Sequence, residues 1–99
     1  DGRFAEAKSS PFDLGRSAWR VVIFDVNGDG KTDAVTAAGE GIRVMLGDGR
    51  GNFSAAPHSP YPTGKGTWRL AVGDLNGDGK PDVATSNLED ESVTIFLAQ

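Results

Sequence analysis

The chain has 99 residues, of which 37% are hydrophobic and 14 are glycine, and its formal net charge is −4. This length and composition predict one small all-β domain with short strands and many turns. The absence of cysteine and of a basic stripe argues against disulfides, thiolate metal sites and a nucleic-acid interface, and no apolar run approaches the roughly 18 residues of a membrane span.

The first half of the chain reads as four short strands around one acidic loop. An extended segment starts at Phe4 and ends at residues 10–12, and a glycine-containing turn leads to Trp19 and Arg20. Apolar runs bounded by turn residues then predict further strands. In order, we expect a strand at 21–24, the acidic loop at 25–33, strands at 34–38 and 42–46, and a glycine-rich connection at 47–53.

The acidic loop contains the residue types that bind calcium. Asp25, Asn27, Asp29 and Asp33 place oxygen side chains at loop positions 1, 3, 5 and 9, and the carbonyl of Lys31 stands at position 7. Calcium takes about six to eight oxygen ligands. Glycines at positions 4 and 6 allow the positive φ values that a loop around an ion needs. We therefore expect a calcium ion in this loop.

The same loop returns 49 residues later, so we expect two calcium ions per chain. The ligands predicted in the second loop are Asp74, Asn76, Asp78, the carbonyl of Lys80, and Asp82. A polar β-turn is the alternative, but it needs only one Asn-Gly or Asp-Gly pair. An EF-hand is excluded because its loop requires a glutamate at position 12, where this chain has Thr36 and Thr85.

Residues outside the loops repeat with the same period. The coinciding positions are Phe4 with Phe53, 10–11 with 59–60, Phe12 with Tyr61, and 19–20 with 68–69. We expect one unit over residues 1–99, with a first repeat at about 4–52 and a second at about 53–99. A period of about 40 to 50 residues with four strands indicates the blade of a β-propeller.

The acidic loops, the hydrophobic strand before each loop and the connection at 47–53 resemble the FG-GAP or VCBS-type repeats of integrin α-chain β-propellers and their bacterial and fungal relatives. The resemblance covers almost the whole chain. It implies four-stranded antiparallel blades, two per chain, in which the loop between two adjacent strands binds calcium.

Two Trp-Arg pairs, Trp19-Arg20 and Trp68-Arg69, precede the first strand of each repeat. In one interpretation the indoles pack between neighbouring blades. In the other they stack on a sugar while the arginines donate hydrogen bonds to its hydroxyls. No serine elbow with a partnered histidine is present, and carboxylates that hold calcium are poorly placed for proton transfer. We therefore expect no catalytic residues and no enzyme activity.

Two blades alone leave apolar sheet faces uncovered, which predicts self-association. Head-to-tail contacts between identical chains can close a ring, so we expect a trimer of six blades or a tetramer of eight, with residues 1–14 completing a blade of a neighbouring chain. The sequence thus predicts a calcium-binding module that self-assembles and binds a glycan or an extracellular protein. The alternative is a purely structural or protein-adhesion repeat. Because calcium is plentiful outside cells, we expect an extracellular or cell-surface location.

Overall fold

The computed structural model describes residues 1–12, 18–39 and 41–99. Within these ranges the chain forms eight β-strands and no helix, which confirms the all-β prediction; accordingly, none of the described residues belongs to a helix that could span a membrane. The strands are β1 (Ala18–Phe24), β2 (Asp33–Ala38), β3 (Gly41–Gly47), β4 (Phe53–Ala55), β5 (Tyr61–Pro62), β6 (Thr67–Gly73), β7 (Asp82–Asn87) and β8 (Ser92–Phe96).

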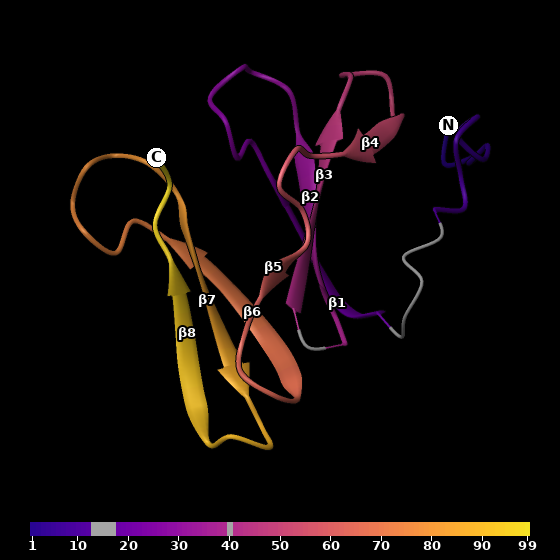
Figure 1. Cartoon of the computed structure of the whole chain (residues 1–99). Helices are drawn as coiled ribbons and strands as arrows, with labels where there is room; N and C mark the ends of the chain where they lie inside the picture. The colour runs from indigo at the N-terminus through magenta and orange to yellow at the C-terminus, as the bar shows by residue number, and fades with distance from the viewer. Residues whose placement is uncertain (13–17, 40) are drawn as a thin grey trace.

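The strands form two antiparallel sheets (Figure 1). The first sheet has the order β1-β2-β3-β4, with β5 also paired to β3, and the second has the order β6-β7-β8. The sequence predicts four strands in each repeat, including an extended one at 4–12, but residues 1–12 belong to no strand. The first sheet has five because residues 56–60, which include Pro57 and Pro60, divide its outer strand into β4 and β5; proline cannot donate to a strand ladder. The second has three because no described segment pairs with the outer edge of β8.

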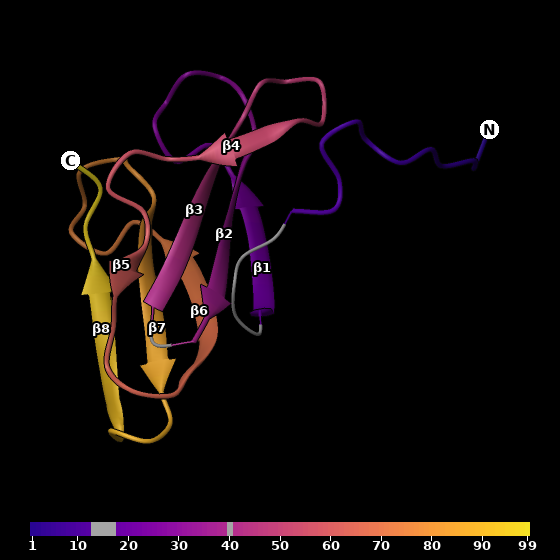
Figure 2. The ribbon, with the colours of Figure 1, turned by 45° about the vertical axis from the view of Figure 1, so that its right-hand side comes forward.

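Each acidic loop joins the first two strands of its sheet. Phe24 at the end of β1 lies opposite Asp33 at the start of β2, and Gly73 lies opposite Asp82 in the second sheet. Both loops lie at the same end of the molecule in two views (Figures 1 and 2). The two candidate calcium sites therefore share one rim of the structure.

The first strand of each sheet contains a β-bulge at its tryptophan. The register of β1 with β2 shifts between Ala18 and Arg20, and that of β6 with β7 shifts between Thr67 and Arg69. The extra residues are Trp19 and Trp68. A bulge redirects the side chain that it contains, so both indoles leave the regular alternation of their strands.

The two sheets pack face to face around the buried residues Val35, Ile42 and Val83, and β6 contacts both β1 and β2. The half-buried residues around this core are Val22, Phe24, Val26, Val44, Tyr61, Leu70 and Phe96. Because strand side chains alternate between faces, Val21 and Ile23 point away from the core and are 61% and 69% exposed. Val93 and Ile95 do the same in the second sheet, at 64% and 49%.

Candidate metal centres

Three carboxylates converge in the first acidic loop. Asp25, Asp29 and Asp33 each offer an oxygen atom within 4.8 Å of the others. Asp25 follows β1 and Asp33 begins β2, so the return of the chain at this rim brings the two ends of the loop together. Asp33 is fully buried, Asp25 is half-buried and Asp29 is exposed. The arrangement leaves one side of the loop open to solvent, from which an ion can enter.

The backbone of the loop wraps around the Asp25 carboxylate. Its Oδ1 accepts hydrogen bonds from the N–H of Gly28 at 2.8 Å and of Asp29 at 3.2 Å, and its Oδ2 accepts one from Gly30 at 2.7 Å. Gly28 and Gly30 have φ values of 75° and 82°, which are strained for residues with a Cβ. The Gly30 N–H makes the largest contribution to lowering the pKa of Asp25 below its ordinary value, so this carboxylate is ionised at neutral pH.

The remaining predicted ligands belong to the same turn. Asn27 Oδ1 accepts a hydrogen bond from the N–H of Asp29 at 3.4 Å, and Asp29 Oδ1 accepts one from Lys31 at 2.8 Å. The donor set available to an ion is therefore all oxygen, three of them from carboxylates that lie within reach of one centre. Hard oxygen ligands in a flexible loop suit calcium and do not suit zinc or copper. The residues present fit a calcium ion.

The second loop repeats the carboxylate cluster and the hydrogen-bond pattern of the first. Asp74, Asp78 and Asp82 offer carboxylate oxygens within 4.8 Å of one another. The equivalent hydrogen bonds to Asp74 come from the N–H groups of Gly77 at 2.7 Å, Asp78 at 3.2 Å and Gly79 at 2.8 Å. Asn76 and Lys80 also repeat the bonds of their counterparts, at 3.4 and 2.9 Å, and the N–H of Gly79 contributes most to lowering the pKa of Asp74.

The last aspartate of each loop also fastens the loop to its sheet. Asp33 Oδ2 accepts a hydrogen bond from the N–H of Val26 at 2.9 Å, and its Oδ1 accepts one from Gly47 at 2.8 Å. Asp82 makes the same two bonds to Leu75 and Ala98, both at 2.8 Å. The spacing of the loop motif did not predict this second role of the aspartate. The sequence feature that could have predicted this role is an aspartate at the start of a buried strand, where a carboxylate without a hydrogen-bond partner would be costly.

Residues 25–85 match the FG-GAP-like repeat. The match covers more than half of the chain, begins at the first residue of the first acidic loop and includes the whole of the second. The chain belongs to the FG-GAP-like repeat family. This confirms the resemblance seen in the sequence, and the family together with the antiparallel sheets supports a propeller-like module. Comparisons with curated proteins and with solved structures gave no match.

The two Trp-Arg pairs of the FG-GAP-like repeats lie at the junction of the two sheets. The rings of Trp19 and Trp68 contact each other, with centroids 4.9 Å apart and an interplanar angle of 47°. Trp19 remains 59% exposed, whereas Trp68 is half-buried. Arg20 and Arg69 are both exposed. The structure therefore brings together two aromatic residues that occupy equivalent positions in the repeats.

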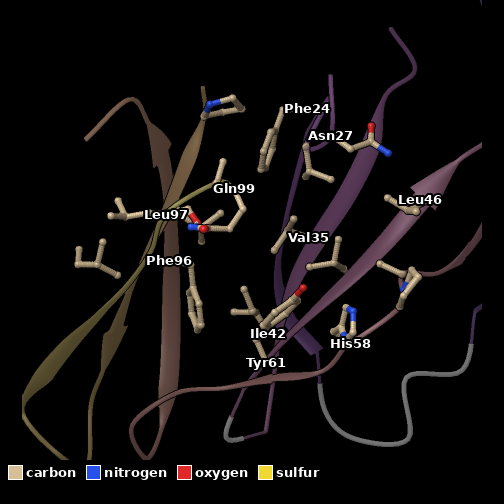
Figure 3. Close-up of a pocket in the computed structure, with 18 residues that line it drawn as sticks. Phe24, Asn27, Val35, Ile42, Leu46, His58, Tyr61, Phe96, Leu97 and Gln99 are labelled. Atoms are coloured by element: carbon tan, nitrogen blue, oxygen red, sulfur yellow. The ribbon is translucent and has the colours of Figure 1, made fainter. Parts of the chain in front are cut away.

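Between the two FG-GAP-like sheets lies an apolar cavity of about 660 Å³ (Figure 3). Phe24, Val35 and Ile42 line it from the first sheet, and Phe96 lines it from the second. Tyr61 and Phe96 meet across it edge to face, with ring centroids 5.8 Å apart. On the first sheet the wall continues past β3 through the segment at 56–58, whereas on the second sheet it ends with β8 and residues 97–99.

Proposed function

We propose that this chain is a calcium-binding β-propeller module that self-assembles into a ring and binds a ligand, with a glycan as the ligand class. The observation that carries the calcium assignment is the convergence of three carboxylates in each of two equivalent loops. Calcium would neutralise the mutual repulsion of these carboxylates and hold both ends of each loop. The ion thereby has a structural role, with Asp25, Asn27, Asp29, Asp33 and the carbonyl of Lys31 as its ligands, and their counterparts in the second loop.

Calorimetric titration tests the calcium assignment directly. Calcium should bind with a stoichiometry of two ions per chain, and magnesium should bind more weakly because it tolerates flexible cages poorly. Asp29→Ala should leave one site, and Asp29→Ala combined with Asp78→Ala should leave none. Glu89→Gln removes a negative charge from an exposed position outside the loops and serves as the control that retains both sites. Equal calcium binding by the wild type and the double variant would refute the assignment.

Exposed apolar side chains on the outward faces support self-assembly. Val21 and Ile23 lie on the far face of the first sheet, and Val93 and Ile95 lie on the far face of the second. Within the chain, opposite faces of the two repeats pack against each other, since Val35 and Val83 share the core but are not counterparts in the repeats, so a head-to-tail contact between copies would repeat an existing interface. Three or four copies then give six or eight blades. Light scattering that finds a folded, calcium-loaded particle of 10.4 kDa would refute the ring.

The exposed face of Trp19 and the exposed side chain of Arg20, the next residue in the chain, support a glycan as the ligand. An aromatic face stacks on apolar sugar C–H groups, and arginine donates hydrogen bonds to hydroxyls. Trp68 and Arg69 form the equivalent pair. We propose binding without enzyme activity, in an extracellular or cell-surface setting, where FG-GAP-like repeats typically occur. A glycan array tests this: binding should be lost in Trp19→Ala and Arg20→Ala.

The alternative function is a structural or protein-adhesion repeat in which calcium only supports folding. The contact between Trp19 and Trp68 favours it, because indoles that pack on one another at a junction between sheets serve the core. In a ring, the exposed face of Trp19 would be covered by the neighbouring copy. A glycan array that shows no binding by the folded, calcium-loaded protein would favour this alternative over the glycan proposal.

A further inference from the structure

Among the residues that the structure describes, none covers the outer edge of β8, whereas the equivalent edge of the first sheet is covered. In the first sheet, β4 and β5 pair with the outer edge of β3. β8 is the counterpart of β3, because Gly47 at the end of β3 and Ala98 after β8 each donate an N–H to the last aspartate of their loop at 2.8 Å. Within the described residues, no segment pairs with the outer edge of β8. Its free N–H and C=O groups can accept another strand.

The chain contains a second segment of the type that covers β3. Residues 4–12 and 53–61 share a phenylalanine at the start, a Ser-Pro pair and a final aromatic residue. They also share a turn, since the N–H of Ser10 donates to the carbonyl of Ala7 at 3.0 Å and the N–H of Ser59 donates to that of Ala56 at 3.2 Å. Residues 1–12 nevertheless belong to no strand. The segment has the local shape of an outer strand without its partner.

Residues 4–12 lie away from β8 of their own chain. In both views the N-terminal residues lie on the side of the first sheet that faces away from the second sheet (Figures 1 and 2). Phe12 contacts Phe53 at 5.7 Å between ring centroids, and Ser9 donates a hydrogen bond to Asn52 at 3.3 Å. These contacts hold the segment at the outer edge of the first sheet. Phe4, by contrast, is 99% exposed.

We propose that residues 4–12 of one copy pair antiparallel with the free edge of β8 in a second copy. This strand exchange rests on the self-assembly proposed above and names the contact that joins neighbouring copies. The register follows from the first sheet, where Gly47 lies opposite Phe53 and Ile42 lies opposite Tyr61. Phe4 therefore lies opposite Ala98 of the partner subunit, and Phe12 lies opposite Val93 of the partner subunit.

Two hydrogen bonds of the first sheet show how the exchanged strand is held. Val44 donates its N–H to Ser59 Oγ at 3.0 Å and accepts a bond from the N–H of Ala56 at 2.9 Å. Ile95 occupies the place of Val44 in the second sheet. In the exchange, the N–H of Ile95 therefore donates to the hydroxyl of Ser10, and the C=O of Ile95 accepts a bond from the N–H of Ala7. An extended peptide that adds to a sheet edge gains affinity from such main-chain bonds.

The cavity between the sheets gives a second, independent argument that a strand of another copy adds to the outer edge of β8. Its wall on the first sheet includes Ala56, Pro57 and His58, which belong to the outer segment that covers β3. On the second sheet the wall ends at β8 and the residues that follow it. An exchanged strand would extend this wall outward, as the segment 53–62 does on the first sheet. It would also reduce the contact of Phe96 with solvent.

Cross-linking between single-cysteine variants tests the exchange, because the chain has no cysteine of its own. Phe4→Cys and Ala98→Cys are mixed in denaturant, refolded together in calcium and oxidised mildly. Facing strand residues have the Cα separation that a disulfide needs. The heterodimer, which mass spectrometry separates from both homodimers, should form. In the control mixture Phe4→Cys is paired with Val93→Cys, which lies at the far end of β8, and the yield should be lower by about tenfold or more.

Each outcome bears on a different claim. A predominant heterodimer in the first mixture alone supports the exchange. Equal yields in both mixtures, or no heterodimer in either, overturn it. A chain that carries both Phe4→Cys and Ala98→Cys should form covalent oligomers, and a cross-linked monomer would show that the segment pairs within its own chain. If light scattering finds an oligomer but the heterodimer is absent, the exchange fails while self-assembly stands; a calcium-loaded monomer overturns both.

Discussion

The Asp33 carboxylate accepts a hydrogen bond from the backbone N–H of Gly47 at 2.8 Å. Because its other oxygen accepts the N–H of Val26 at 2.9 Å, this one side chain connects the acidic loop to the C-terminal end of β3. Asp33 is fully buried, so the two bonds are shielded from competing water. The last aspartate of the loop is thus part of the sheet before any ion is bound, whereas Asp29 is exposed and bonds only within the loop.

This difference predicts unequal effects of two substitutions in calcium-free buffer. Asp33→Ala should lower the free energy of unfolding by about 3 kcal/mol, because it leaves two backbone donors without partners. Asp29→Ala should have little effect there, because it removes a charge from a crowded acidic loop. Chemical denaturation in chelator measures both values. If the two variants are equally stable without calcium, the sheet-fastening role of Asp33 is wrong.

Calcium removal should lower the melting temperature of the wild type. A ligand at a concentration about 100-fold above its Kd stabilises the folded state by about 2.7 kcal/mol per site. For a domain of this size each kcal/mol corresponds to about 4–8 °C. Differential scanning calorimetry in chelator and in millimolar calcium should therefore show a shift of at least about 10 °C that magnesium does not restore. Superimposable curves would contradict a structural role for the ion.

Asn87 holds a buried polar cluster at the opposite end of the second sheet. Its Nδ2 donates to Ser92 Oγ at 3.1 Å and to Thr94 Oγ1 at 2.8 Å, and its Oδ1 accepts a bond from Thr85 at 3.2 Å. Asn87→Ala should cost about 2–3 kcal/mol of stability because it leaves the buried hydroxyl of Thr85 without its acceptor. Ser86→Ala, on the exposed side of the same strand, is the matched control. Equal unfolding curves for the two variants would count against the cluster.

The connection between the repeats contains an aspartate with a shifted pKa. The side-chain amide of Asn52, followed by the backbone N–H of Arg50, lowers the pKa of Asp48. A lowered pKa in the folded state gives stability that is present above the ordinary pKa of about 3.9 and is lost as the pH falls through the folded value. NMR titration of Asn52→Ala should show the pKa of Asp48 moving upward. An unchanged titration would refute the hydrogen bond as its cause.

Local patterns in the sequence were sufficient to predict the three inner strands of each sheet and the acidic loops, but not the outer strands, since residues 1–12 belong to no strand. The run at 21–24 ends where the first aspartate of the loop begins, and both features depend only on neighbouring residues. The convergence of Asp25, Asp29 and Asp33 follows from the spacing of the motif, so the carboxylate cluster could be predicted as well. The same motif, repeated once, was sufficient to identify the FG-GAP-like family.

Features that depend on how distant segments meet could not be predicted in the same way. The contact of Trp19 with Trp68 depends on two bulges and on the angle between the sheets. The bond from Gly47 to Asp33 joins residues that are 14 positions apart. The loop motif had already assigned the Asp33 side chain to the metal site, so it gave no sign of this second role. The division of the outer strand into β4 and β5 arises from prolines that resemble ordinary loop residues. None of these three features leaves a periodic pattern in the sequence.

The pair formed by Trp19 and Trp68 gives the molecule an intrinsic optical reporter. The chain has two tryptophans, and both belong to this pair. All of the indole fluorescence of the chain therefore originates where the two sheets meet. Indoles in contact couple their electronic transitions, so circular dichroism in the indole absorption bands should be sensitive to the separation of the sheets. Any event that moves one blade relative to the other, including the filling of an acidic loop, can then be followed without a label.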